Sequence, residues 1–255
     1  MSILGDSIST YGGISNGAAY TTTNSTIQAN AVWNYGPSRP EFGVTDASMT
    51  WWQRTIDALG ANRLVNNSYS GDKITNYVLK GRCTQLHDDT GDNAGTKPDI
   101  IFVYLGTNDF SAVGADVGSV AHLSMNDIAT KAANSGYGTS SVAEAFAVML
   151  YRMKTAYPDA EIYCLTVLEK PGVNVNALTT FNDGLCAAAA LFEDVHVADI
   201  FRDSGIHDDE NFDFYVPNNR LHPGGEGMRV ISEVLLTSVM ENSKYLTADL
   251  DDLLS

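Results

Sequence analysis

The stretch that decides the fold is PDIIFVYLGTND, residues 98–109 of a chain of 255 residues. Consecutive apolar residues, Ile100–Leu105, follow Pro98 and Asp99 without a polar interruption. An unbroken apolar run of this kind is typical of a strand covered on both faces, as in a parallel sheet with helices on either side. The polar residues that come directly after it are then expected at the carboxyl end of a central strand.

Strands and helices alternate along the rest of the chain. Further strands are expected at residues 2–5, 63–67, 161–167 and 195–200, and helices at 49–59, 141–157, 178–191 and 225–240. The helix at 141–157 opens on Ser141 and Glu144, which have the spacing of a capping box. No repeat or linker interrupts the alternation. We therefore interpret residues 1–255 as a single α/β domain with a central parallel sheet and helices on both faces.

The composition indicates a globular protein and excludes several classes of partner. Hydrophobic residues make up 44% of the chain, and no run approaches the roughly 18 apolar residues of a membrane span. The net charge of −16 makes nucleic acid and anionic membranes poor partners, because their phosphates would be repelled. No signal peptide is visible, so we expect a soluble protein, cytoplasmic or secreted with its signal segment trimmed.

Three segments lack regular periodicity: residues 11–46, 110–118 and 201–221. Each follows a predicted strand and should emerge at the carboxyl edge of the sheet, where ligands bind in open α/β folds. The acidic segment 87–93 holds metal-friendly side chains, but its spacing does not match a calcium loop, so we interpret it as a solvated loop. No metal or cofactor is predicted.

Three short motifs at predicted strand ends combine into a candidate site for acyl transfer. Ser7 follows the first strand, Asn108 follows the apolar run at 100–105, and His222 precedes the last helix. A serine hydroxyl is a weak nucleophile until a base takes its proton, and the oxyanion that develops needs hydrogen-bond donors. Each motif alone is more often a turn or a cap. Together they supply a nucleophile, a base and a donor.

These motifs resemble those of the SGNH hydrolases, the GDSL-type esterases and lipases. The blocks that carry the resemblance are Gly5-Asp6-Ser7-Ile8-Ser9, Asn67-Ser68-Tyr69-Ser70-Gly71-Asp72, Gly106-Thr107-Asn108-Asp109 and Leu221-His222-Pro223. The resemblance extends from residue 5 to about residue 235 and implies a flavodoxin-like, three-layer α/β/α sandwich. It also implies that Ser7 is the nucleophile and His222 the general base. The Ser7 amide, the Gly71 amide and the Asn108 side chain would form the oxyanion hole.

The sequence departs from the family at one position. Three residues before the histidine, where the family usually has an aspartate, this chain has Asn219. A carboxylate there orients the imidazole and stabilises the imidazolium, whereas an amide supplies orientation without charge. Three accounts are open: Asp213 or Asp209 replaces the missing carboxylate, a backbone carbonyl orients His222 in a Ser-His dyad, or the site is weakened and mainly binds.

Aromatic residues in segment 11–46 are expected to contact the substrate, above all Tyr11, Trp33 and Tyr35. Flat aromatic faces beside polar groups suit sugars, and the sequence lacks the aliphatic runs expected around the mouth of a long-chain lipase. The alternative is that these aromatics pack together as a small core. We therefore expect a serine esterase that hydrolyses small acyl esters, chiefly acetyl esters, of small molecules or oligosaccharides. Two alternatives are a carbohydrate-binding protein on a weakened hydrolase scaffold and an acyl hydrolase of the lipase or lysophospholipase type.

Overall fold

The computed structural model describes residues 1–12, 14, 35–37, 40–76, 81–88, 94–134, 141–217 and 220–246. Its strands are β1 (Ser2–Gly5), β2 (Ile100–Tyr104), β3 (Glu161–Leu165) and β4 (Val195–Ala198). Its α-helices are α2 (Trp51–Ala58), α4 (Thr107–Val113), α5 (Met125–Ala133), α6 (Val142–Ala156), α7 (Val175–Ala189), α8 (Ile200–Asp203), α9 (Phe212–Tyr215) and α10 (Gly225–Asn242). Short 3-10 turns lie at η1 (Ser7–Ser9), η3 (Pro40–Phe42), η4 (Ala47–Met49) and η5 (Arg82–Thr84).

The four strands form a parallel sheet in the order β1-β2-β3-β4. The segment 63–67, predicted as a strand, runs alongside β1 without being a regular strand. The Ile3 amide donates to the Val65 carbonyl at 2.8 Å, and the Asn67 amide donates to the Ile3 carbonyl at 2.8 Å. One isolated parallel bridge, between Ile3 and Asn66, completes this pairing. The predicted parallel α/β sheet is therefore confirmed.

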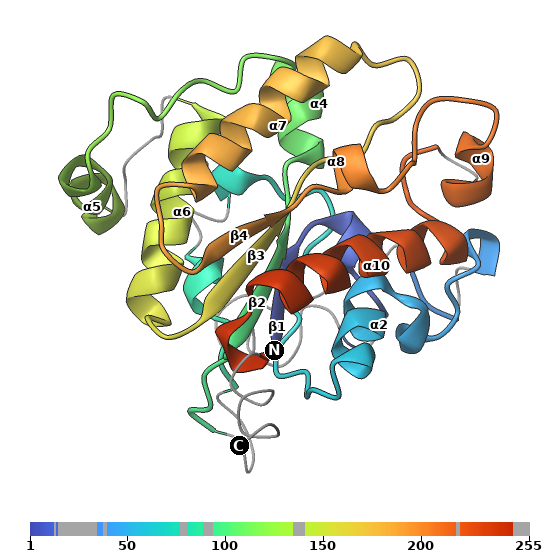
Figure 1. Ribbon diagram of the computed structural model, residues 1–255, viewed down its shortest axis with the longest axis horizontal. Coiled ribbons are helices and arrows are strands. Elements are labelled where there is room, and N and C mark those ends of the chain that lie inside the picture. Colours follow the sequence, from blue (N-terminus) through green and yellow to red (C-terminus); the bar gives the residue numbers. More distant parts are fainter. Residues whose placement is uncertain are drawn as a thin grey trace, which may run out of the picture.

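Helices cover both faces of the sheet and make three layers (Figure 1). Helices α2 and α10 pack on one face, and α6 and α7 pack on the other. Side chains of β2 alternate between two apolar cores: Ile100, Phe102 and Tyr104 belong to the core with α2 and α10, and Ile101 and Val103 to the core with α6 and α7. Because both faces of β2 are buried, its sequence is apolar at every position.

Two segments that we predicted to be irregular contain helices. Helix α4 begins at Thr107, directly after β2, and runs into the segment 110–118, while α8 and α9 lie around and within the segment 201–221. The prediction was wrong there because helices of four to seven residues are too short to show a clear 3.6-residue period. Helix α5 was also missed.

Helix α6 begins as predicted, but its capping differs in detail. The Ser141 hydroxyl accepts a hydrogen bond from the Glu144 amide at 3.3 Å. The Glu144 carboxylate lies 3.4 Å from the Lys131 ammonium of α5, and so links two helices instead of closing a capping box. In the part of the chain that is described, no helix is both long and apolar enough to cross a membrane.

Candidate active site

Ser7 lies in a tight turn directly after β1. The Asp6 side chain caps this turn by accepting a hydrogen bond from the Ile8 amide at 3.0 Å. Gly5 is required by the close approach of the turn, since a Cβ atom at this position would lie 2.2 Å from the Ser9 hydroxyl oxygen. The sequence Gly-Asp-Ser thus places the serine side chain at the carboxyl edge of the sheet.

His222 approaches Ser7 from the other end of the chain. Its Nε2 atom lies 2.9 Å from the Ser7 Oγ atom, and each residue is only 7% exposed. The ring of Phe42 packs edge-on against the imidazole with a centroid distance of 5.8 Å, and the ring of Tyr35 does so at 6.3 Å. The Tyr35 hydroxyl also donates to the Pro223 carbonyl at 2.9 Å. These contacts hold the imidazole at hydrogen-bonding distance from a serine hydroxyl.

Gly71 presents a backbone amide near the same strand end. It has a φ of +79°, a conformation that favours glycine, and a Cβ atom there would meet nothing within 4 Å. The glycine is therefore needed for its backbone conformation and not for space. Within the described residues, neither the Gly71 amide nor the Ser7 amide has a hydrogen-bond acceptor.

Asn108 brings a side-chain amide to this group from the start of α4. Its Nδ2 atom donates to the Asp72 carbonyl at 2.9 Å. The Asp6 carboxylate is the second neighbour of Nδ2, at 3.5 Å, which is too long for a strong hydrogen bond. One N–H of Asn108 is thus firmly anchored, and the other makes only a long contact.

Backbone contacts tie these segments into one unit. The Tyr69 amide donates to the Gly5 carbonyl at 3.0 Å, and the Ile74 amide donates to the Asp109 carboxylate at 2.9 Å. The first contact joins the segment before Gly71 to the end of β1, and the second joins the segment after it to α4. Ser7, Gly71 and Asn108 therefore come from three segments with fixed relative positions.

Two buried carboxyl groups lie beneath the site. Burial raises the pKa of Asp6 to about 7, against the Ile8 amide bond that lowers it, and the neighbouring Asp109 and Asp72 raise it further. Burial also raises the pKa of Asp109 to about 6, opposed by the hydrogen bond from the Ile74 amide. Both groups share a poorly solvated environment in which the charged form is disfavoured.

The structure does not bring the predicted carboxylates to His222. Asp213 pairs with the Arg220 guanidinium at 2.9 Å, and its side chain is 72% exposed. Asp209 caps its own turn by accepting from the Asn211 amide at 2.8 Å. Neither carboxylate makes a hydrogen bond to His222 in the described structure. Asn219 lies outside the described residues.

Tyr11 and Tyr35, which we predicted to contact the substrate, are buried instead. Tyr35 is 1% exposed, and Tyr11, at 6%, donates its hydroxyl to the Thr45 carbonyl at 2.7 Å. Both join the core beside α2 and α10, so the packing alternative describes them better. Trp33 lies outside the described residues.

Sequence reasoning missed a buried ion pair next to Gly71. The Arg82 guanidinium contacts the Asp72 carboxylate, and both side chains are 3% exposed. Their separation of ten residues corresponds to no regular helical or strand period, so no spacing rule indicates the pair.

No metal centre is found among the described residues, where no cluster of three or more histidine, cysteine, aspartate or glutamate side chains suits an ion. The predicted solvated segment 87–93 is described only at its beginning, where the His87 Nδ1 atom lies 2.9 Å from the Tyr157 hydroxyl. His87 is therefore held by a hydrogen bond to Tyr157.

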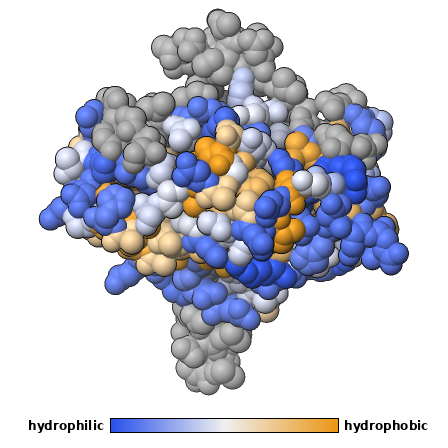
Figure 2. All heavy atoms as spheres, turned by 90° about the horizontal axis from the view of Figure 1, so that it is seen from above, coloured by the Kyte–Doolittle hydropathy of each residue, from blue (hydrophilic) through white to orange (hydrophobic). Residues whose placement is uncertain are grey.

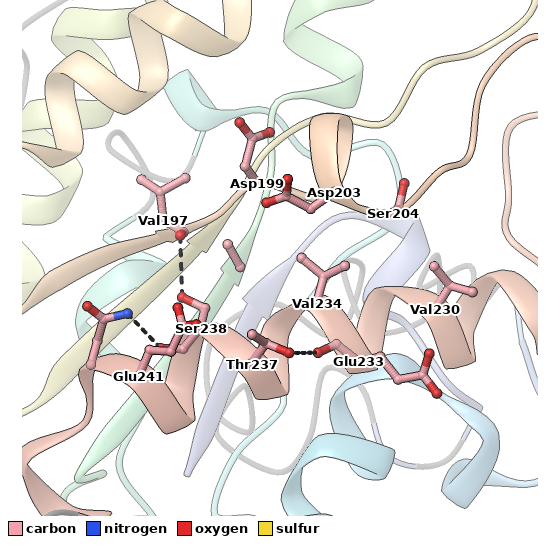
Figure 3. Close-up of a pocket in the computed structure, with 12 residues that line it drawn as sticks. Val197, Asp199, Asp203, Ser204, Val230, Glu233, Val234, Thr237, Ser238 and Glu241 are labelled. Atoms are coloured by element: carbon pink, nitrogen blue, oxygen red, sulfur yellow. Dashed lines mark hydrogen bonds between the residues drawn. The ribbon is translucent and has the colours of Figure 1, made fainter.

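A separate hollow of about 590 Å³ lies between β4, α8 and α10 (Figure 3). Carboxylates of Asp199, Asp203, Glu233 and Glu241 line it, but Ser7, Asn108 and His222 do not. Asp199 is already engaged by the Arg202 guanidinium at 2.6 Å and by the Thr166 hydroxyl at 2.9 Å. This hollow offers no nucleophile and base in contact, so we place the candidate site at Ser7.

The surface on the side of the strands' carboxyl ends shows a central band of apolar residues bordered by hydrophilic ones (Figure 2). Exposed apolar side chains on helices that follow the strands include Val113 of α4, at 38%, and Phe214 of α9, at 67%. Helix α9 is joined to the His222 loop by the bond from the Gly224 amide to the Tyr215 carbonyl at 2.8 Å.

A parallel sheet between two helix layers, with a hydrogen-bonded serine and histidine at its carboxyl edge, is typical of serine hydrolases. Comparison with known families identifies which family of hydrolases the chain belongs to. The family model of GDSL-like lipases and acylhydrolases matches residues 1–184, and the chain belongs to this family. The protein is therefore a hydrolase that acts on esters. No curated protein matches the sequence.

Solved structures share the fold over nearly the whole chain. A protein of Bacteroides ovatus that carries the description GDSL-like lipase has 25% sequence identity and a TM-score of 0.59, with 94% of this chain and 98% of that chain covered. A carbohydrate esterase of family 3 from Talaromyces cellulolyticus has 14% identity and a TM-score of 0.53, covering 94% and 95%. An acetyl esterase variant solved with acetate has 15% identity and a TM-score of 0.51, covering 94% and 95%.

Proposed function

We propose that this protein is a serine esterase of small acyl esters, chiefly acetyl esters on carbohydrates, with Ser7 as nucleophile and His222 as general base. The observation that carries the proposal is the 2.9 Å contact between Ser7 Oγ and His222 Nε2 at the carboxyl edge of the sheet. A base at this distance is placed to take the hydroxyl proton as the nucleophile attacks.

The reaction proceeds in two acyl-transfer steps. Ser7 Oγ attacks the ester carbonyl carbon, and its proton passes to His222 Nε2. The oxyanion accepts hydrogen bonds from the Ser7 amide, the Gly71 amide and the Asn108 side chain. The C–O bond to the alcohol breaks, and His222 returns the proton to the leaving oxygen. Water then attacks the acyl-enzyme with His222 as base, which releases the acid and restores Ser7.

The orientation of His222 has two sources in this proposal. Packing against Phe42 and Tyr35 fixes the plane of the ring. We retain Asn219 as the residue that positions the far side of the imidazole. Asp213 is not retained, because it pairs with Arg220 on the surface. Among the described residues, the two carboxylates predicted for this role, Asp209 and Asp213, make their contacts elsewhere, which favours the account in which His222 is not oriented by either of them.

The preference for carbohydrate acetyl esters is supported by two of the structural neighbours, whose names describe a carbohydrate esterase and an acetyl esterase. One observation favours a second candidate, an acyl hydrolase for longer chains. Phe214 of α9 and Val113 of α4 expose apolar surface, which suits an acyl chain; α4 also carries Asn108, and α9 is bonded to the loop that carries His222.

The test is hydrolysis of a chromogenic acetyl ester and of acetylated oligosaccharides, compared with esters of long acyl chains. We expect Ser7→Ala to lower kcat by at least about 10³-fold, because the nucleophile is lost. A serine-reactive phosphonate should label the wild type at Ser7. The matched control Ser119→Ala, on an exposed loop, should retain full activity.

Three outcomes decide between the functions. Full activity in Ser7→Ala overturns the mechanism. Faster hydrolysis of long-chain esters than of acetyl esters selects the second candidate. Binding of oligosaccharides by a wild type without esterase activity indicates a carbohydrate-binding protein on the same scaffold.

A further inference from the structure

Arg82 is a fully enclosed cation next to the candidate site. Arg82 is 3% exposed. It is the first residue of the 3-10 turn η5, which follows Gly81 in the left-handed conformation. Burying a guanidinium is costly unless its donors find partners, so the contacts it makes indicate what it is kept for. Its side chain contacts one short segment at several points: residues 67–72, which we call the oxyanion loop because it contains Gly71.

The guanidinium contacts the beginning, the middle and the end of the oxyanion loop. Its Nη2 atom donates to the Asn67 carbonyl at 2.9 Å and to the Asn67 side-chain oxygen at 3.1 Å. Its Cζ atom lies 5.1 Å from the centre of the Tyr69 ring. Its Nη1 atom pairs with the Asp72 carboxylate. One rigid planar group thereby sets the distance between the two ends of the loop.

The position of the loop matters for the reaction through two atoms. The Gly71 amide is one proposed donor to the oxyanion. The Asp72 carbonyl accepts from Asn108 Nδ2 at 2.9 Å and so orients a second donor. Donors stabilise the transition state only when they lie about 2.7–3.1 Å from the developing oxyanion, so a small shift of the loop weakens both interactions.

We propose that Arg82 is a positioning residue for the oxyanion hole: it holds the loop 67–72 in the one shape that aims the Gly71 amide and, through the Asp72 carbonyl, the Asn108 side chain at the oxyanion. This inference rests on the proposed function and extends it to a residue that does not touch the substrate. Lysine cannot replace Arg82 in this role, because a single ammonium cannot reach Asn67 and Asp72 with fixed geometry.

The experiment compares Arg82→Lys, Arg82→Met and the double variant Arg82→Met/Asp72→Asn with the wild type on an acetyl ester. We expect kcat to fall about 10²-fold in each, with KM changed less than about threefold, because oxyanion donors act mainly in the transition state. Inhibition by an acetyl-sized trifluoromethyl ketone, whose Ser7 adduct carries an oxyanion, should weaken by the same factor as kcat/KM.

Stability is separated from positioning by the double variant. Arg82→Met leaves the Asp72 carboxylate buried without its cation and should lower Tm, whereas the double variant removes both charges and should recover much of that Tm without recovering kcat. If Arg82→Met does not fold, Arg82→Lys and the double variant carry the test.

Arg63→Met is the control, because the Arg63 guanidinium also lies over an aromatic ring, that of Trp52 at 5.4 Å, but not at the oxyanion loop.

Wild-type kcat in folded Arg82→Lys or in the double variant overturns this inference and leaves the proposed function intact. A kcat that rises and falls with Tm across the variants also overturns it, because that pattern marks a purely structural role. Activity in Ser7→Ala overturns the proposed function and this inference with it.

Discussion

Asp6 precedes the proposed nucleophile and its carboxyl group is completely buried. Burial raises its pKa from the ordinary 3.8 to about 7, with a further contribution from the charges of Asp109 and Asp72. The folded protein therefore holds this proton more tightly than the unfolded chain does. Between these two pKa values the folded state binds more protons, so the contribution of Asp6 to the free energy of unfolding falls as the pH rises from about 4 to about 7.

We predict that the Asp6→Asn variant becomes more stable than the wild type as the pH rises from about 4 to about 7. Asparagine keeps an oxygen for the Ile8 amide but has no charge to bury. The difference in unfolding free energy should grow by a few kcal/mol, on the order of 1.4 kcal/mol for each unit of pKa shift. Urea denaturation at several pH values between 4 and 8 measures it. For the exposed control Asp213→Asn, the free energy of unfolding should change with pH as it does in the wild type. The same pH dependence in Asp6→Asn as in the wild type would contradict the prediction.

Helix α5 shows how a local signal stabilises an element at the edge of the fold. The Ser124 hydroxyl accepts from the Asp127 amide at 3.2 Å, and the Asp127 carboxylate accepts from the Ser124 amide at 2.8 Å. This is a complete capping box. The box that we predicted at Ser141 is incomplete, because Glu144 is directed to Lys131 of α5. The sequence pattern of a capping box was present at both helices. Only the box at α5 forms, because the Lys131 ammonium draws the Glu144 carboxylate away from the first turn of α6.

Ser124→Ala should lower the free energy of unfolding by about 1 kcal/mol, because the first turn of α5 loses its acceptor. Thr130→Ala is the matched control, since this exposed hydroxyl donates only to the Asn126 carbonyl within the same helix. Chemical denaturation of the three proteins compares them. Equal losses in both variants would show that the cap does not contribute.

The molecule as a whole carries a large excess of negative charge, with 31 acidic residues against 15 basic ones. Several of the basic residues are already paired, as Arg202 is with Asp183 and Asp199, and Arg229 with Glu226 and Glu233. The remaining carboxylates repel one another across the surface. This self-repulsion disfavours the compact state and is screened by salt.

We therefore expect Tm to rise by a few degrees when NaCl is raised from about 10 mM to about 200 mM at neutral pH, a range over which the screening length falls severalfold. Thermal scans in NaCl and in a neutral osmolyte of equal osmolarity distinguish screening from solvent exclusion. A Tm that falls with salt would mean that the surface ion pairs outweigh the repulsion.

The sequence by itself determined the α/β class, the four strands of the sheet and the longest helices, and it supplied the motifs that define the candidate site. The apolar run at 100–105 predicted a central parallel strand, because period and polarity are local properties of the chain. The Gly-Asp-Ser and Gly-Thr-Asn-Asp motifs likewise placed Ser7 and Asn108 at strand ends. Helices of fewer than eight residues, such as α4, α8 and α9, escaped detection because they are too short to display a period.

Only the tertiary structure decided which distant residues meet and which are buried. Ser7 and His222 are 215 positions apart and come within 2.9 Å because the first strand and the loop before α10 reach the same edge of the sheet. From the sequence, Tyr35 could either contact a sugar or pack in the core. In the structure it is buried, and its ring packs against the imidazole of His222. The pKa of Asp6 and the pairing of Arg82 with Asp72 follow from burial, which depends on the whole fold and not on neighbours in sequence.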